Sequence, residues 1–361
     1  MAEPRAAALA AEPRRSAPQV LRDLVREVGI PRLLIAVFLL LLFAVAFLTR
    51  MDMPGLFTDC ILRIARNGII VLALLPSIQG GLGLNFGLPI GIICGLVGCV
   101  ITLNAGLGGW GGLGLSAAIG AALAVPAGAA YGVLLNRTRG QEMMVGTYLG
   151  FAIVSGMSIF WTMAPFHNPQ LVWAISGRGL RTTLTLTGFY DKLLDNLGSF
   201  ELAGVTVPVG TLGLFALACV LVGLFFRTRA GLTISAARSS PRFALAAGIL
   251  DDRTRVQATV LSTVIAAVGI VVFCQSYGFI QLYVAPLYMA FPAVACLLIG
   301  GGAVARATLL HVVIGTVLFQ SILTVALPVT GQIVQGDISD TARLIIQNGM
   351  ILYALTRRGD R

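Results

Sequence analysis

Charge is the scarcest property of this chain. Only 11% of its 361 residues are charged, whereas 57% are hydrophobic. A soluble domain carries roughly 25% charged residues, so this chain has less than half the usual supply for a wetted surface. The composition therefore excludes an ordinary soluble globular domain, and it places most of the chain in lipid.

Metal ligands and catalytic side chains are also few. Six cysteines are scattered along the sequence, mostly inside apolar runs, and no pair has CxxC or zinc spacing. The two histidines, His167 and His311, lie far apart without acidic or cysteine neighbours. Catalysis within lipid would need a Ser/His/Asp set, an Asp pair or a metal cluster. We therefore expect no catalytic residue, no metal and no cofactor.

Two further absences narrow the class of protein. The apolar runs hold almost no acidic residue, and Glu142 is the nearest candidate for the carboxylate that ion or proton coupling usually needs. No Gly-x-x-x-x-Gly-Lys-Ser/Thr sequence is present, so the chain itself should not hydrolyse ATP. The net charge of +10 does not indicate nucleic acid, because the basic residues lie at the ends of apolar runs.

Long apolar runs dominate what is present. A membrane span needs about 20 apolar residues, somewhat fewer inside a bundle. The 43 glycines fit helices that pack closely in lipid. The sequence thus predicts an all-α polytopic membrane protein of about ten transmembrane helices, some of them broken. The predicted spans are 32–49, 61–79, 86–104, 113–135, 143–163, 209–227, 256–276, 284–299, 304–327 and 341–356.

Basic residues orient these spans. With a cytoplasmic N-terminus, eighteen of the 25 fall in cytoplasmic segments, and the other seven are Arg50, Arg63, Arg66, Arg178, Arg181, Lys192 and Arg343. This bias predicts both termini in the cytoplasm of a bacterial inner-membrane protein. Residues 1–31 are interpreted as a cytoplasmic tail, with an amphipathic helix over Val20–Val28, and not as a cleaved signal peptide. Residues 32–357 form the predicted transmembrane domain.

Two predicted loops exceed turn length. The first, about 164–208, is extracytoplasmic in this topology. Its stretch Arg181–Thr187 alternates like a strand, and Phe189–Leu197 fits a short surface helix. The second, about 227–255, is cytoplasmic.

The second span ends in a segment with four glycines and a proline, Gln79–Pro89. In the membrane, the backbone groups that Gly and Pro free must be satisfied by protein, water or ligand. Broken helices of this kind often line transport sites, although an ordinary inter-helix turn is an equal alternative. The predicted substrate-path residues are Gln79, Asn85, Glu142 and Gln275. Each could equally bond a neighbouring helix, and Glu142 could pair with an arginine.

The cytoplasmic loop contains a short predicted helix. Ser239 is a suitable N-cap, Pro241 suits a first turn, and Gly248 would end the helix. Such a helix could dock a soluble motor, and a plain connecting helix is the alternative. The predicted docking residues are Arg238, Ser239, Ser240, Pro241, Arg242, Phe243, Ala244 and Gly248.

This loop resembles the cytoplasmic segment of permease subunits of ABC importers, in the branch for branched-chain amino acids, ribose, other simple sugars and nucleosides. That segment runs roughly Arg-Ala-x-Gly-x-Asn-Pro-x-Ala-Ala-x-x-x-Gly-Ile. Here Ala237–Ala244 and Ala247–Ile249 stand in the matching places, with Ser239-Ser240 replacing Gly-x-Asn. Further stretches resemble the family in the right order: Phe47–Thr49, Ile61–Leu75 and Ile78–Leu82, then Leu298–Ala303 and Leu310–Thr316. The Asp of the sugar branch after the two glycines is missing. The resemblance covers residues 40–357.

The resemblance implies a permease that works with partners. Two permease subunits, identical or related, would enclose the path, and two ATP-binding subunits would bind the cytoplasmic loops. A periplasmic or lipid-anchored binding protein would deliver a small polar solute. A simple sugar or nucleoside is expected first, since Gln141–Thr147 resembles a stretch of nucleoside-type permeases, and a branched-chain amino acid stays open. The alternative function is a secondary active transporter without an ATPase.

Overall fold

A bundle of long helices makes up almost all of the described structure. The computed structural model describes residues 30–163, 179–283, 285–303 and 306–333, together with 166, 168, 171, 172, 345, 348 and 349. Its helices are α2 (Ile30–Leu48), α3 (Met53–Leu72), α4 (Leu74–Gln79), α5 (Leu88–Asn104), α6 (Gly109–Arg137), α7 (Glu142–Met163), α8 (Leu193–Asn196), α9 (Val209–Phe225), α10 (Arg229–Ser239), α11 (Pro241–Ala246), α12 (Asp251–Tyr277), α13 (Ala285–Ile299) and α14 (Leu309–Ile333).

Several of these helices are long and apolar enough to cross a membrane. In the described part there are five, with α3 and α4 counted together, and a sixth if α9 and α10, bent by 70°, form one span. α2, α5 and α13 are shorter apolar helices. Each predicted span except the last overlaps a helix or, for 61–79, two helices, while most of 341–356 and the helix predicted over Val20–Val28 lie outside the described residues. The structure is thus a polytopic helical bundle, and the count of ten stays a prediction.

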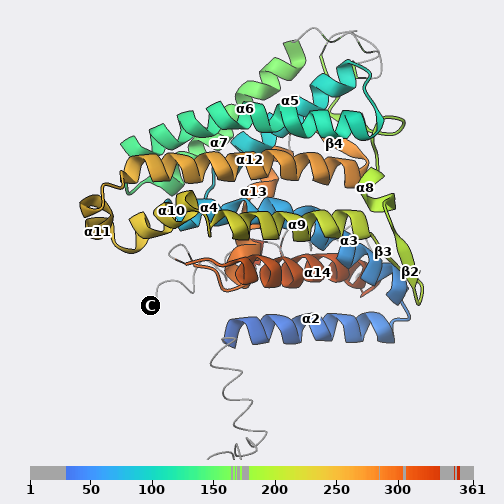
Figure 1. The fold of residues 1–361 in the computed structure, drawn as a ribbon. Coiled ribbons are helices and arrows are strands. Elements are labelled where there is room, and N and C mark those ends of the chain that lie inside the picture. The colour runs from blue at the N-terminus through green and yellow to red at the C-terminus, as the bar shows by residue number, and fades with distance from the viewer. Residues whose placement is uncertain are drawn as a thin grey trace, which may run out of the picture.

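Small residues let the central helices approach closely. α12 runs beside α5, α6 and α3 in the middle of the bundle (Figure 1). On α5, a Cβ atom added to Gly95 would lie 2.3 Å from the carbonyl oxygen of Ala267 on α12. Such close packing is how helices associate where lipid removes the hydrophobic drive between them. Apolar side chains at the periphery stay exposed, among them Leu40 of α2 at 68%, as a lipid-facing surface requires.

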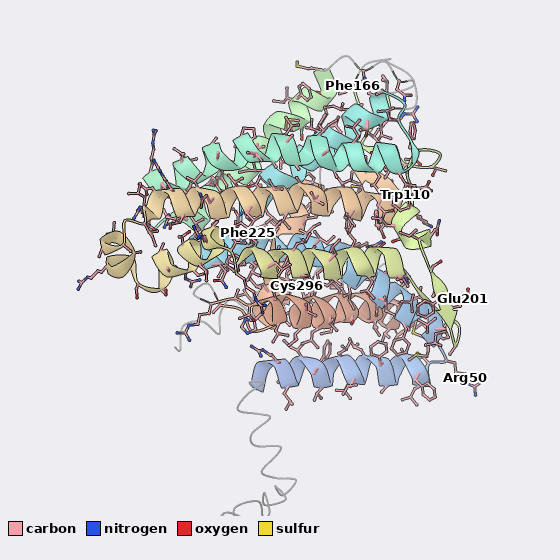
Figure 2. The ribbon with its side chains drawn as sticks, in the orientation of Figure 1. Arg50, Trp110, Phe166, Glu201, Phe225 and Cys296 are labelled. Atoms are coloured by element: carbon pink, nitrogen blue, oxygen red, sulfur yellow. The ribbon has the colours of Figure 1, made fainter. Side chains whose placement is uncertain are left out.

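The loops gather alternately at the two ends of the bundle. At one end Gln79 Nε2 donates to the Ala307 carbonyl at 2.8 Å, and α10 and α11 project beside it. At the other end Lys192 N donates to the Gln275 carbonyl at 2.7 Å, near α8 and the strands β2 and β3. Figure 2 places Phe225, where α9 meets α10, and Glu201 of β2 at these opposite ends. This alternation is what the arginine-based topology requires, whereas the side of the membrane stays a prediction.

Four short strands cover the end that carries α8. β1 (Thr183–Thr185) pairs antiparallel with β4 (Phe279–Gln281), with Leu184 opposite Ile280. The predicted alternation over Arg181–Thr187 is confirmed in this part, because Leu184 and Leu186 are buried while Thr183 and Thr185 are exposed. The predicted helix over Phe189–Leu197 is much shorter, and only α8 forms.

A hairpin in the same loop was not predicted. β2 (Phe200–Leu202) pairs antiparallel with β3 (Val205–Val207) across a two-residue turn. Ala203 and Gly204 in that turn have φ angles of +52° and +82°. Two positive φ angles are typical of the tight turns that match strand twist.

Several predicted span boundaries are wrong by four residues or more, and two of them have a clear local cause. α3 begins at Met53 instead of 61, because Asp52 is extended and Pro54 favours the first turn of a helix. α14 begins at Leu309 instead of 304, because the preceding chain makes a turn. There Gly301 has a φ of +87°, and Ala303 and Arg306 exchange backbone hydrogen bonds.

Candidate functional site

A pocket of about 690 Å³ lies at the end of the bundle that carries α10 and α11, and we name it the end pocket. Three segments far apart in sequence form it: the turn after α4, the start of α7 and the last turn of α10. Its lining residues are Gly81, Leu82, Gly83, Gly140, Gln141, Glu142, Met143, Met144 and Arg238. The pocket therefore brings together the glycine-rich segment, the stretch around Glu142 and the predicted docking loop.

The glycine-rich segment is a turn that is buried on both sides of the exposed Gly81. Gly81 has a φ of +76° and its N–H donates to the Ile78 carbonyl, while Leu82 N donates to Ser77 O, both at 3.1 Å. This pair of bonds is the usual glycine C-cap, which satisfies carbonyls left free at a helix end. Leu82 and Leu84 beyond it are less than 5% exposed. The segment is thus a turn between α4 and α5 that lines a pocket, and its place at a transport site stays a prediction.

Asn85 links the same segment by hydrogen bonds to α6 and α12 and, through Ser262, to the junction of α3 and α4. Its Oδ1 accepts hydrogen bonds from Gly87 N at 2.9 Å and from the Tyr131 hydroxyl at 3.1 Å. Its Nδ2 donates to Ser262 Oγ at 2.9 Å, and Ser262 in turn donates to the Ala73 carbonyl, where α3 breaks into α4, at 2.6 Å. In this conformation the Asn85 amide is engaged within the protein. Its place in the substrate path stays a prediction.

Glu142 belongs to a nearly buried ion pair. Its Oε1 lies 2.7 Å from Arg255 Nη2, and its Oε2 accepts from Gly140 N at 2.9 Å. Arg255 Nε also donates to Asn136 Oδ1 at 2.9 Å. The two charged side chains are only 16% and 9% exposed. The expectation that Glu142 pairs with an arginine is confirmed, and its partner comes from α12, not from the neighbouring loop.

An exposed charge cluster flanks this pair. Arg139 lies 3.0 Å from Asp251 and also bonds Asp252, and its side chain is 52% exposed. The hydrogen bond that Arg139 donates to the Asp252 carboxylate raises the pKa of the Arg139 guanidinium, which therefore stays charged. The cluster joins the α6–α7 turn to the start of α12.

The other two predicted path residues lie at opposite ends of the bundle. Gln79 is half-buried and bonded to Ala307, one turn from the end pocket. Gln275 is fully buried near α8, where its Oε1 accepts from Leu194 N at 3.2 Å. Its Nε2 has no hydrogen-bond partner among the described residues. The structure therefore does not bring Gln275 to the pocket, and the roles of both residues stay predictions.

The docking loop forms two helices instead of one. Ser240, with φ −147° and ψ 79°, separates α10 from α11. The predicted cap at Ser239 is wrong: Ser239 is the last residue of α10, and its Oγ donates back to Ser235 O at 3.0 Å. The reason is Pro241, because a residue before proline is disfavoured in the helical region. Ser240 must therefore leave the helix, and α11 starts at the proline.

The predicted end of the docking helix is confirmed. Gly248 has a φ of +76°, and its N–H and that of Ile249 donate to Leu245 O and Ala244 O at 3.0 and 2.9 Å. Both bonds belong to the same glycine C-cap motif as at Gly81. Arg242 is exposed and Leu245 is 64% exposed, so α11 presents a basic and an apolar residue away from the bundle.

Arg66 of α3 is a buried charge that the sequence analysis used only for topology. It is 7% exposed, and its Cζ lies 4.9 Å from the Tyr277 ring centre and 5.4 Å from that of Phe273. None of the described carboxylates forms an ion pair with it, and its Nε has no partner there. The signal was an arginine inside an apolar run, where ionisable residues often have a function.

The interrupted bundle of long apolar helices defines a class, the multi-pass membrane proteins. Residues 59–355 match the family model described as branched-chain amino acid transport system / permease component, and the chain belongs to that family. The family includes ABC importer permeases for sugars, and the chain is accordingly a transporter's membrane subunit and not itself an enzyme. Comparisons with curated proteins and with solved structures gave no match.

Proposed function

We propose that the chain is the permease subunit of an ABC importer in a bacterial inner membrane, with both termini in the cytoplasm. Two such subunits, identical or related, enclose the path of a small polar solute. The solute is a simple sugar or a nucleoside in the first place, with a branched-chain amino acid as the second candidate. ATP-binding subunits and a periplasmic or lipid-anchored binding protein complete the importer.

The observation that carries this proposal is the position of α10 and α11, which we name the docking segment (residues 229–246). The segment projects from the bundle beside the end pocket (Figure 1). A short helix with exposed Leu245 and Arg242 can lie in a groove of a soluble partner through its apolar side chain and a charged rim. An ATPase bound there would be next to the end of the solute path.

The secondary transporter is weakened by the state of Glu142. Ion or proton coupling needs a carboxylate that can change its partner during transport. The carboxylate beside the end pocket is held by Arg255 and by a backbone N–H, so its charge is already balanced within the protein. This arrangement fits a fixed structural pair better than a coupling site.

Affinity purification tests the proposal directly. The tagged chain is isolated in mild detergent from its native host, and the bound proteins are identified by mass spectrometry. We expect an ATP-binding subunit in an amount similar to the permease, and a second permease sequence if the pair is heteromeric. A chain that purifies alone, under conditions where other transporter complexes survive, would favour the secondary transporter.

Two glycine-to-valine substitutions, one in the docking loop and one as a control, test the docking segment. Gly248→Val places a β-branched residue at a φ of +76° with no atom nearby, which strains the end of α11 by about 1–2 kcal/mol without a clash in the bundle. Gly188→Val is the matched control, because Gly188 has a φ of +83°, equally open surroundings and a place at the other end. We expect Gly248→Val, or a flexible linker over 239–244, to lose the ATPase and solute uptake. If Gly248→Val keeps the ATPase and solute uptake as well as Gly188→Val does, docking at α11 is contradicted.

A further inference from the structure

The hairpin of β2 and β3 has one apolar face and one polar face. Its register pairs the apolar residues of the two strands with each other, and side chains directly opposite in an antiparallel pair lie on the same face. The apolar face, which we name the hairpin face, consists of Phe200, Leu202, Val205 and Val207. Glu201 and Thr206 form the pair on the opposite face. The short hairpin is therefore amphipathic.

The hairpin face is largely uncovered. Phe200 is 50% exposed and Leu202 is 67% exposed, and Leu197, just before the hairpin, is exposed as well. Single exposed apolar residues are ordinary on a protein surface, whereas a contiguous group marks a surface that meets a partner or a membrane. The group thus calls for an occupant.

Contacts with α3 fix the height of the hairpin along the bundle. Thr206 N donates a hydrogen bond to Thr58 Oγ1 at 2.9 Å. At the tip, a Cβ atom added to Gly204 would lie 3.4 Å from Cβ of Pro54. Pro54 and Thr58 belong to the first two turns of α3, which together with α4 is long and apolar enough to cross a membrane. The hairpin therefore lies beside the end of a span and not far above it.

The lipid-facing surface of α2 reaches the same height. Phe47 in the last turn of α2 is 71% exposed, and Phe43 stacks on the partly exposed Phe57 of α3 with ring centres 5.0 Å apart. Figure 2 shows Arg50, just after α2, and Glu201 at the same end of the bundle. The apolar surface of α2 thus continues over the start of α3, against which the hairpin packs.

The free edge of the hairpin limits how deep it can lie. The edge of β3 is satisfied by Thr58, whereas within the described residues no hydrogen bond joins the Glu201 backbone to a segment outside the hairpin. Free strand edges need water or polar groups and are not found in hydrocarbon. The strands run across the end of the bundle in Figure 1, so that their faces look along the helices. The backbone can therefore stay at headgroup level while one face points into the membrane.

We propose that the hairpin is an interfacial anchor whose apolar face rests on the lipid leaflet at this end of the bundle. Phe200 and Leu202 enter the boundary between headgroups and acyl chains, and Glu201 points to water. Amphipathic elements of this kind bury their apolar face about 5–10 Å into that boundary. Lipid is the occupant because the hairpin continues the lipid-facing surface of α2 at the level where α3 begins. The inference needs only that the chain spans a membrane, and it is independent of solute and ATPase.

Fluorescent reporters on neighbouring residues of β2 test the anchor. The full chain with Leu202→Cys or with Glu201→Cys is labelled with a nitrobenzoxadiazole maleimide and reconstituted into phospholipid nanodiscs without any partner protein. Glu201→Cys is the matched control, because Glu201 is also exposed but lies on the opposite face of the same strand. The native cysteines give a low background, since five are buried and Cys219 is half-buried, and the labelled parent chain measures it.

Two quenchers report where each label lies. Iodide quenches labels in water, and lipids with a doxyl group near the headgroup end of an acyl chain quench labels in the membrane boundary. We expect the ratio of lipid quenching to iodide quenching to be several-fold larger at Leu202→Cys than at Glu201→Cys, with a blue-shifted emission at Leu202→Cys. A third reporter, Phe200→Cys, should resemble Leu202→Cys, because successive side chains of a strand alternate between its faces.

The pattern along the strand decides the outcome. Size-exclusion chromatography first confirms that each labelled variant is folded and monodisperse. Iodide quenching at Phe200→Cys and Leu202→Cys as strong as at Glu201→Cys would overturn the anchor, and the hairpin face would then be a surface for a protein partner. Strong lipid quenching at all three positions would also overturn it, since the hairpin would then be immersed with both faces in lipid.

Discussion

At the scale of single residues, burial decides which ion pairs contribute to the stability of the protein. Two arginine clusters lie at the same corner of the bundle. The Arg255–Glu142 pair is nearly buried, whereas Arg139 and Asp252 are exposed and Asp251 is half-buried. Removing one partner from a buried pair leaves an uncompensated charge, while water replaces an exposed partner at little cost.

Matched arginine substitutions test this difference. We expect Arg255→Met to lower the free energy of unfolding by about 3 kcal/mol, because the nearly buried Glu142 then lacks its counter-ion. Arg139→Met should cost about 1 kcal/mol or less. Denaturant unfolding of the purified chain in detergent measures both values. The double change Glu142→Gln with Arg255→Met should recover part of the loss, and equal losses for the two single arginine variants would contradict the argument.

At the scale of elements, small residues set how closely neighbouring helices cross. α13 and α14 meet at two glycines. A Cβ on Gly315 would lie 1.8 Å from the Cys296 carbonyl oxygen, and one on Gly300 would lie 1.9 Å from that of His311. Backbone atoms cannot move aside as flexible side chains can, so the crossing depends on the absence of both Cβ atoms.

A pair of alanine substitutions on α14 tests the crossing. Gly315→Ala should destabilise the protein by about 2 kcal/mol, because the added methyl overpacks the contact. Gly331→Ala is the control on the same helix, since nothing lies within 4 Å of its added Cβ. Alanine is the better helix former there, so stability should be unchanged or slightly higher. Thermal unfolding in detergent distinguishes the two variants. If Gly315→Ala left the stability unchanged, α13 and α14 could move apart at little cost in free energy, and the argument would be contradicted.

At the scale of the whole molecule, the loops alternate between two ends. At one end, Asn136 forms a hydrogen bond with Asp252, and Arg238 forms one with Ile78. At the other end, Thr58 forms a hydrogen bond with Thr206. Loops on one side of a membrane must lie at one end of a bundle. The structure therefore supports the alternation of the predicted spans, and the arginine bias predicts which end faces the cytoplasm.

Reporter fusions test the sides of the membrane. Green fluorescent protein fused after Arg361 should fluoresce, because the C-terminus is predicted to be cytoplasmic, and alkaline phosphatase fused there should be inactive. Phosphatase inserted at the β2–β3 turn, after Ala203, should be active as the matched control. The opposite pattern at both sites would invert the topology. Phosphatase activity at both sites would place both outside the cytoplasm, and with a cytoplasmic N-terminus the chain would then have an odd number of spans.

The sequence by itself predicted the class of the protein, the position of most spans and the glycine that ends α11. These features depend on local composition: an apolar run must avoid water wherever it is, and only glycine takes the backbone angle at Gly248 without strain. The proline that starts α11 was also visible, although its effect on Ser240 was overlooked.

Only the tertiary structure decided the partners of the polar residues. Glu142 bonds Arg255 across 113 residues, and Arg238 bonds Ile78 across 160. Hydropathy and helical periodicity say which residues leave water, but not which helices become neighbours. That choice depends on how the surfaces of many helices fit together, and it alone assembles the end pocket from three distant segments.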